Sequence, residues 1–300
     1  MDNAIGMLSV VGTPIGNLGD LSPRALETLQ TADLIAAEDS RTTAQLLSQY
    51  GVTGVRIVPC HKFNEREAAN AVVDALLRGE NAALVTDAGM PCISDPGYLL
   101  VQAAIEAGIQ VTVVPGACAA VAAIAVSGFN ALSFAFYGFL PRTAGEIRKV
   151  LRRVADEYAP LSVFYESPNR IAETVALVEE VLPEASVCVC NDLTKKFERI
   201  YRGSPTDVLR ELRENPNVTK GEYVLLVYRA VVPEKEEAKL SPEALLVDRM
   251  VKDGLTPREA VSALAKERVA PKGVLYDAAV RLRTCLRTMS EPKGGASDDE

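Results

Sequence analysis

The chain has 300 residues, of which 48% are hydrophobic and 24% are charged. This composition predicts packed cores and excludes collagen-like or largely disordered chains. The formal net charge is −8, from 32 Lys and Arg against 40 Asp and Glu, and such an acidic protein argues at first against nucleic acid as a partner. The charge is uneven, because residues 1–140 hold 6 basic and 13 acidic residues whereas residues 240–290 hold 9 basic and 6 acidic residues. The total charge therefore excludes no partner by itself.

The start of the chain has no basic segment followed by a long apolar one, which predicts a cytoplasmic protein without a secretory signal. The uncharged stretch 117–140 is long enough to cross a bilayer, but Ser127, Gly128 and Asn130 interrupt it. We interpret it as a buried helix, a turn and a buried strand, and we expect no membrane partner. The six cysteines form no CxxC pair, which favours reduced thiols. The only histidine is His61, which argues against a zinc site or a Ser-His-Asp triad, and we expect no metal.

Residues 1–118 alternate short apolar runs with helical patterns. Ser22 followed by Pro23 is typical of a helix N-cap and first helical residue, and the sequence at 64–67 resembles a capping box. This alternation predicts an α/β domain with a mostly parallel sheet whose apolar strands are covered on both faces. The expected strands lie at residues 8–11, 33–37, 56–58, 82–85 and 111–114.

A second α/β domain is expected at residues 119–232. The apolar runs at 186–191 and 198–202 are too close together for a crossover helix, which predicts a mixed sheet. The other expected elements are strands near residue 134 and at 161–165 and 223–228, and helices at 145–157 and 171–181.

The remainder of the chain has a different pattern. A charged linker is expected at 233–241, and residues 242–289 have the pattern of a small helical module in which Thr256 and Pro257 start a helix. The tail at 290–300 is rich in Gly and Asp, which predicts disorder.

Three glycine-containing loops follow expected strands and meet at one edge of the first sheet, where parallel sheets bind ligands. The first, at 12–19, has the spacing G-x-x-x-G-x-x-G, and Pro14 stands where a dinucleotide-binding loop has its second glycine, which argues against NAD. The second, at 87–97, offers two carboxylates and no lysine, which favours a neutral or cationic ligand over a triphosphate. The third, at 115–120, has small side chains that let a flat ligand approach the backbone.

Several motifs in these loops and beyond them are specific in combination. The most specific are TPIGNLGD at 13–20, AEDSR at 37–41 and SDPG at 94–97. Further motifs are HKFNE at 61–65, FYGFLPR at 136–142, FYES at 164–167, DLTKKFE at 192–198 and KGE at 220–222. FYES and KGE are short, and only their order along the chain makes them informative. Together with the helical end, they resemble the ribosomal RNA methyltransferases of the tetrapyrrole methylase superfamily over nearly the whole chain.

The resemblance implies two α/β domains with S-adenosylmethionine bound in the cleft between them, and a homodimer. It also implies 2′-O-methylation of a cytidine in the decoding region of small-subunit (16S) rRNA, so the small ribosomal subunit is the expected partner. The cofactor-binding residues that it implies are Pro14, Asp87, Ala88, Gly89, Ser94, Asp95, Pro115, Gly116, Ala119, Tyr165 and Glu222.

A ribose hydroxyl is a weak nucleophile, so a nearby base or cation should help it to lose its proton. The candidates are Asp87, Asp95, Glu166, Lys220 and Glu222, of which we select Lys220, Glu166 and Asp87 as catalytic residues. Glu166 and Glu222 are equally open to a purely structural role. Clustered basic side chains predict contacts to RNA phosphates, with an ordinary solvated helix face as the alternative. The candidates for RNA contacts are Arg142, Arg148, Lys149, Arg152, Arg281 and Arg283.

Four residues depart from the family pattern: Met90, Ala117, Asn191 and Asp192 stand where the family usually has Thr, Pro, Arg and Glu, and Asp192 keeps the acid with a shorter side chain. Two other functions stay open. One is a tetrapyrrole methylase of the precorrin or sirohaem type, and the other is a non-catalytic RNA-binding protein of ribosome assembly. The basic helical end and the basic cluster at 142–153 favour RNA, because a small porphyrinoid needs neither.

Overall fold

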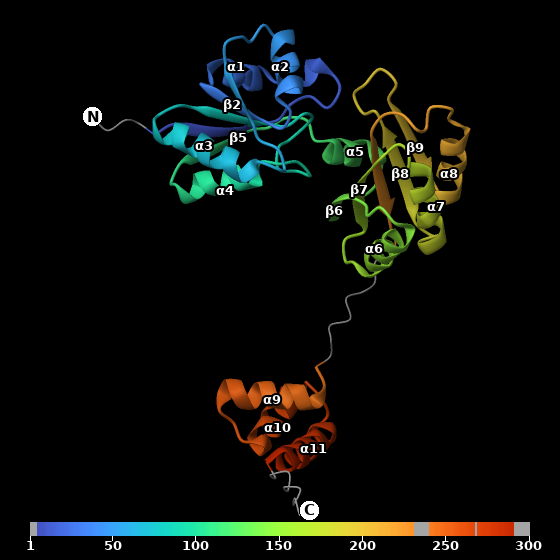
Figure 1. Ribbon diagram of the computed structural model, residues 1–300. Coiled ribbons are helices and arrows are strands. Elements are labelled where there is room, and N and C mark those ends of the chain that lie inside the picture. The colour runs from blue at the N-terminus through green and yellow to red at the C-terminus, as the bar shows by residue number, and fades with distance from the viewer. Residues whose placement is uncertain (1–4, 231–239, 268, 291–300) are drawn as a thin grey trace, which may run out of the picture. The chain divides into compact units, whose positions relative to one another are not determined.

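The structure is a computed structural model that describes residues 5–230, 240–267 and 269–290 (Figure 1). Its contacts divide the chain into two compact units, Met1–Pro233 and Glu234–Glu300, and each is described by itself. Most of the linker expected at 233–241 and all but the first residue of the tail expected at 290–300 lie outside the described residues. The expected boundary between two domains near residue 118 stays a prediction.

The first unit begins with a five-stranded sheet, which we call sheet A. Its order is β3-β2-β4-β1-β5, and every neighbouring pair is parallel, which confirms the expected parallel sheet. The strands are β1 (Met7–Val11), β2 (Leu34–Ala37), β3 (Arg56–Pro59), β4 (Ala82–Val85) and β5 (Gln110–Val114). Helices α1 (Pro23–Thr31) and α2 (Ser40–Gln49) cover one face, and α3 (Glu65–Leu77) and α4 (Tyr98–Glu106) cover the other (Figure 1).

Strand β2 shows why the strands of sheet A are apolar throughout. Its residues Leu34 and Ala36 pack in the cluster with α3 and α4, whereas Ile35 and Ala37 pack in the cluster with α1 and α2. Alternate side chains of a strand point to opposite faces, and here both faces are covered by helices. The faces are therefore closed, and only the edge where the strands end is left for ligand-binding loops.

Of the helix starts predicted in the first domain, that of α1 is confirmed and the capping box of α3 is not. Ser22 caps α1, since its hydroxyl accepts a hydrogen bond from the Ala25 amide at 3.1 Å, as expected. The capping box expected at 64–67 was wrong, because Asn64 makes no side-chain hydrogen bond into α3. Its Oδ1 instead accepts from the His61 amide at 2.8 Å, and its Nδ2 donates to the Pro59 carbonyl at 2.9 Å. The Asn64 side chain thus bonds to the turn before α3 and is not available to cap the helix.

A second five-stranded sheet, sheet B, has the order β6-β7-β10-β8-β9. Strands β6 and β7 are parallel and the other pairs are antiparallel, which confirms the expected mixed sheet. The strands are β6 (Phe134–Phe139), β7 (Leu161–Glu166), β8 (Ser186–Asn191), β9 (Arg199–Gly203) and β10 (Tyr223–Tyr228). One face packs on α6 (Ala144–Asp156), α7 (Ile171–Val181) and α8 (Pro205–Glu214), and the other packs on α5 (Ala119–Ser127).

The uncharged stretch 117–140 forms α5 and β6, but the expectation that both are buried was wrong. In α5, Val121 and Val126 are 56% and 39% exposed. Strand β6 lies at the edge of sheet B, and Phe134 and Phe139 are 45% and 61% exposed. An edge strand has one neighbour instead of two, so an all-apolar sequence there leaves large side chains uncovered.

The second unit consists of α9 (Pro242–Asp253), α10 (Pro257–Lys266) and α11 (Lys272–Ser290). Leu246, Leu264 and Leu275 are buried in its core. Thr256 and Glu259 form a capping box at the start of α10, which confirms the helix start expected there. No helix of the described residues is long and apolar enough to cross a membrane.

Candidate active site

The loops after β1, β4 and β5 are tied together by their backbones. The amide of Gly12 donates to the Val114 carbonyl at 3.0 Å, and Thr13 and Gly89 exchange two hydrogen bonds of 2.9 and 3.2 Å. A Cβ atom on Gly12 would lie 2.6 Å from the Cα atom of Gly116. Only glycine permits this approach, so the glycines of the first and third loops bring these loops together. Beyond Gly12 the first loop continues into the short 3₁₀ helix η1 (Leu18–Asp20).

Carboxylates gather where β2 and β4 end. Glu38 accepts a hydrogen bond of 2.6 Å from the Thr86 hydroxyl, and Asp87 accepts one of 3.2 Å from the Asp39 amide. Burial and the neighbouring charge of Glu38 raise the pKa of Asp95 to about 6, and the same two causes raise the pKa of Asp87. This edge of the sheet therefore attracts positive charge.

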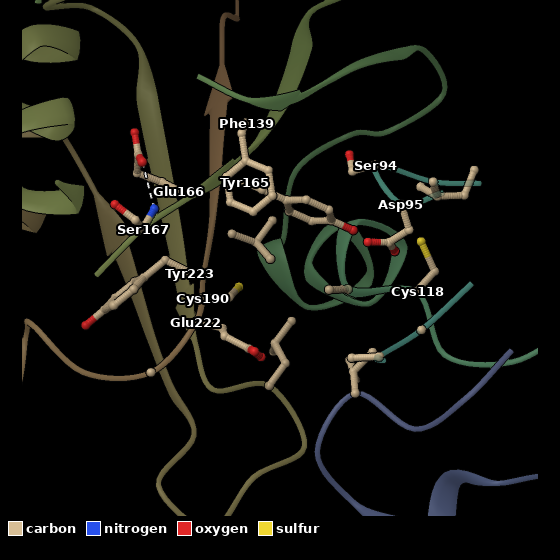
Figure 2. Close-up of a pocket in the computed structure, with 18 of the residues that line it drawn as sticks. Ser94, Asp95, Cys118, Phe139, Tyr165, Glu166, Ser167, Cys190, Glu222 and Tyr223 are labelled. Atoms are coloured by element: carbon tan, nitrogen blue, oxygen red, sulfur yellow. Dashed lines mark hydrogen bonds between the residues drawn. The ribbon is translucent and has the colours of Figure 1, made fainter. Parts of the chain in front are cut away.

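A pocket of about 330 Å³ lies among these loops and the facing edge of sheet B (Figure 2), at the lower end of the range for small-molecule sites. Residues from the two sheets share it. Its lining from the sheet A loops is Ile15, Ala88, Gly89, Met90, Ile93, Ser94, Asp95, Cys118 and Ala119; that from sheet B and its loops is Phe139, Tyr165, Glu166, Ser167, Pro168, Cys190, Leu193, Gly221, Glu222, Tyr223 and Val224.

Tyr165 and Glu222 are two of the polar residues that line the pocket on the sheet B side. The Tyr165 hydroxyl points toward Asp95 and Cys118 (Figure 2), and burial raises the pKa of this phenol to about 12, so it stays neutral and able to donate a hydrogen bond. The Glu222 side chain is 70% exposed, and its Oε2 accepts a hydrogen bond of 2.9 Å from the Lys195 ammonium. No Lys, Arg or His is among the described residues that line the pocket, which suits a ligand that carries positive charge.

The residues that the sequence predicted for the cofactor lie in and around this pocket. Pro14 is buried inside the first loop without lining the pocket, and Pro115 and Gly116 lie in the third loop, where they shape the site without bordering it. Asp87 is exposed beside the lining residue Ala88. The predicted residues that line the pocket are Ala88, Gly89, Ser94, Asp95, Ala119, Tyr165 and Glu222.

Glu166, a catalytic candidate, is committed to the fold. Its side chain is fully buried and forms an ion pair of 2.5 Å with Arg170. It also accepts hydrogen bonds of 2.7 Å from the Ser167 amide and 2.8 Å from the Thr174 hydroxyl. Figure 2 shows the carboxylate turned away from Ser94 and Asp95. A carboxylate with all these donors fixes the start of α7, and we no longer count it among the proton acceptors.

Lys195, which was not among the candidates predicted from the sequence, forms an ion pair with the lining residue Glu222. Lys220 is exposed and precedes the lining residue Gly221, but it does not line the pocket. Lys195, in the DLTKKFE motif, donates to Glu222 and also lies 3.2 Å from Asp192. Partial burial opposes the charge on Lys195, but the bonds to Glu222 and Asp192 outweigh it and raise its pKa. The DLTKKFE motif could be recognised in the sequence, but the position of the Lys195 side chain beside Glu222 follows only from the fold.

The candidates for RNA contacts lie on two separate units. On α6 and the loop before it, Arg142, Lys149 and Arg152 are exposed, whereas Arg148 is paired with Glu180 at 2.8 Å. In the second unit, Arg283 is exposed. Its neighbour Arg281 is paired with Glu243 at 2.6 Å.

The first unit thus consists of two unlike α/β sheets that share one pocket. A family model described as "Tetrapyrrole (Corrin/Porphyrin) Methylases" matches residues 7–208. The chain is 40% identical over 277 residues to "Ribosomal RNA small subunit methyltransferase I" of Pasteurella multocida (strain Pm70), which covers 92% of this chain and 97% of that protein. It is 41% identical, with the same coverage, to the protein of that name from Haemophilus influenzae (strain ATCC 51907 / DSM 11121 / KW20 / Rd). The chain belongs to the tetrapyrrole methylase family and, within it, to the group of these small-subunit methyltransferases.

Solved structures agree on the fold. "Crystal structure of the methyltransferase CobJ" matches with a TM-score of 0.56 at 20% identity and covers 75% of this chain and 95% of that one. The uroporphyrin-III-C-methyltransferase from Thermus thermophilus matches with a TM-score of 0.50 at 19% identity, covering 74% of this chain and 94% of that one. At these identities the similarity concerns the fold alone, and it confirms the pair of α/β sheets expected from the sequence.

Proposed function

We propose that this protein transfers a methyl group from S-adenosylmethionine to the 2′-oxygen of a cytidine in the decoding region of small-subunit rRNA. The observation that carries the proposal is a pocket with carboxylates and without cations among its described lining residues, in a chain about 40% identical to proteins named for methylation of small-subunit rRNA. The small ribosomal subunit or its rRNA is then the partner, and the cytoplasm is the place of action.

The lining residues fit such a cofactor. Carboxylates of Asp95 and Glu222 suit its positive charges, and Ile15, Met90 and Ile93 offer apolar contacts for a flat ring. When bound, the cofactor supplies a methyl group activated by an adjacent sulfonium, so alignment with the acceptor can account for much of the rate.

The acceptor hydroxyl has to lose its proton during the transfer. Glu222 is the best-placed group to take it, because its carboxylate borders the pocket, is largely exposed and keeps one oxygen outside the bond to Lys195. Asp87 and Lys220 remain proposals of lower rank, since neither borders the pocket. Tyr165 would hold its proton and donate a hydrogen bond, in keeping with its high pKa.

A tetrapyrrole methylase is the second candidate, and the description of the matching family model, with the fold shared with a uroporphyrin-III-C-methyltransferase, supports it. The exposed basic residues Arg142, Lys149 and Arg152 favour RNA, because they suit a polyanion better than a porphyrinoid. The second unit, with its exposed Arg283, adds to this preference.

We also propose a homodimer. Apolar side chains lie open at the free edges of the two sheets: Val113 of β5 is 52% exposed, and Leu132 before β6 and Phe134 in it are exposed as well. Open apolar edges of sheets are typical of surfaces that a second chain covers.

The test is a titration followed by a transfer assay. The purified chain is expected to bind S-adenosylmethionine in a calorimeter, which a non-catalytic assembly protein would not require. It should then transfer labelled methyl groups to small ribosomal subunits or their naked rRNA and not to uroporphyrinogen. Transfer to the tetrapyrrole alone would reverse the ranking, and absence of cofactor binding would leave only the non-catalytic function.

A further inference from the structure

The loop between β8 and β9, residues 192–198, is held in one conformation. Asp192 and Thr194 have φ angles of 51° and 68°, which residues other than glycine adopt only when the surroundings enforce them. The amide of Lys195 donates to the Asp192 carbonyl at 2.9 Å, and the amide of Thr194 donates to the Glu198 carboxylate at 2.6 Å. Such enforced strain is found where a loop has to present particular side chains.

This loop is fixed to the border of the pocket. The amide of Asp192 donates to the Glu222 carbonyl at 3.0 Å, and the amide of Glu222 donates back to the Asp192 carboxylate at 3.3 Å. Gly221 has a φ of 87°, and a Cβ atom there would lie 2.3 Å from Oδ2 of Asp192. Because Gly221 and Glu222 line the pocket, the loop stands at its edge.

The loop displays two cations and an aromatic ring. The ammonium of Lys195 lies beside Glu222 at the pocket, and the ammonium of Lys196 lies 5.6 Å from the ring centroid of Phe197. The Phe197 side chain is 73% exposed, so it adds nothing to a core. An exposed ring among lysines is the combination that binds single-stranded nucleic acid, since bases stack on the ring and phosphates pair with the cations.

We propose that residues 192–198 form a subsite for the nucleotide next to the one that is methylated, with Phe197 stacking on its base and Lys195 and Lys196 contacting phosphates. The subsite rests on the proposed methylation of RNA. Lys195, paired with Asp192 and Glu222, neutralises part of the negative charge at the pocket border that would repel a polyanion, and the Lys196 ammonium lies next to the exposed ring. A single ring between charged residues gives no broad apolar surface for a protein or a membrane.

The test compares Phe197→Ala, Phe197→Tyr and Lys195→Ala in the full-length chain. The matched control is Tyr158→Ala, which removes another exposed ring. Tyr158 lies before the start of β7, whereas the lining residues Tyr165 and Glu166 stand at the end of that strand. The measurements are kcat and KM for naked small-subunit rRNA, affinity for a labelled single-stranded RNA oligonucleotide, affinity for S-adenosylmethionine, and Tm.

Phe197→Ala is expected to raise KM for rRNA and to weaken oligonucleotide binding by about 5- to 150-fold, the range measured for loss of one stacked base. Phe197→Tyr should restore both, and Tyr158→Ala should change neither. Lys195→Ala should weaken RNA binding and reduce the slope of log affinity against log salt by about one. In Phe197→Ala and Phe197→Tyr, cofactor affinity and Tm should stay at the values of the unchanged chain.

The subsite is overturned if Phe197→Ala leaves KM and oligonucleotide affinity unchanged, or if it lowers Tm and cofactor affinity as much as RNA affinity. Failure of the proposed function is a separate result. If the unchanged chain transfers no methyl group to rRNA, the proposed methylation is wrong, while oligonucleotide binding that depends on Phe197 still supports an RNA-binding loop.

Discussion

Gly16, in the loop after β1, and Lys195, in the loop after β8, are in direct contact. A Cβ atom on Gly16 would lie 2.4 Å from Cγ and 3.0 Å from Cε of Lys195. The missing side chain at Gly16 thus leaves room for the methylene stem of Lys195, whose ammonium then reaches Glu222. The contact joins a loop of sheet A to a loop of sheet B beside the pocket.

Gly16→Ala should therefore displace Lys195 without removing its charge. We expect KM for rRNA to rise about as much as in Lys195→Ala, with Tm nearly unchanged, because Gly16 is exposed and does not line the pocket. The double variant should be no worse than either single one, since both changes remove the same interaction.

The matched control for this displacement is Gly19→Ala in the same loop, where the nearest atom to a new Cβ is Asn17 Oδ1 at 3.2 Å, which accepts a hydrogen bond of 3.0 Å from the Gly19 amide. It should alter KM by less than about twofold, the usual size of a surface effect. Additive effects of Gly16→Ala and Lys195→Ala would show that the two residues act independently and would contradict the role given to their contact.

Glu166→Gln tests whether this buried carboxylate stabilises the fold or takes part in the reaction. Leaving Arg170 without its charged partner should lower the free energy of unfolding by about 3 kcal/mol, the lower end of the cost of breaking a buried pair. Thr174→Val, which removes one hydrogen bond to the same carboxylate, should cost about 1 kcal/mol. Denaturant unfolding measures both. Unchanged stability with kcat abolished would return Glu166 to the catalytic residues.

Asp95 gives the site a dependence on pH. Its pKa rises from 3.8 to about 6 on folding, so the free protein keeps a proton that the unfolded chain has lost, and its stability falls as pH rises between these values. Affinity for a cationic cofactor should show the opposite trend and increase as pH rises through about 6, because only the ionised carboxylate attracts the ligand. Calorimetry across this window should show the trend in the unchanged chain and a flatter profile in Asp95→Asn. An equal slope in both would assign the titration to another group.

The open edge of β5 predicts how the chain associates. Val113→Lys places a charge on this edge, and we expect it to convert a dimer to a monomer in sedimentation experiments, since burying an unpaired charge at an interface is unfavourable. Val251→Lys on α9 is the matched control, because Val251 is also an exposed valine. A chain that is monomeric without any substitution would remove the basis for the dimer.

The parallel sheet and the loops at its edge could be predicted from the sequence because their signals are local. Strand and helix periods alternate along residues 1–118, and ligand-binding loops of parallel sheets follow strand ends. The edge position of β6 could not be predicted in this way. A run such as Phe134–Phe139 is apolar whether its strand has one neighbour or two, and only the pairing decides which side chains are exposed.

The roles of single charged residues were harder to predict. Glu166 and Lys195 both occur in motifs that point to the site, yet one is enclosed by its own helix start and the other turns toward Glu222. Glu166 is fixed by its contacts to Arg170 and Thr174, whereas Lys195 is placed by the turn at Asp192, which has a positive φ angle. Neither follows from residue type or spacing alone.

The most direct test of the proposed function is mass spectrometry of nucleosides from mapped fragments of small-subunit rRNA, in cells with and without the gene for this chain. We expect one cytidine of the decoding region to lose its 2′-O-methyl group on deletion and to regain it when the unchanged chain is expressed. The Gly16→Ala and Phe197→Ala variants should restore it only in part. An identical ribose-methyl pattern with and without the gene would contradict the proposed function.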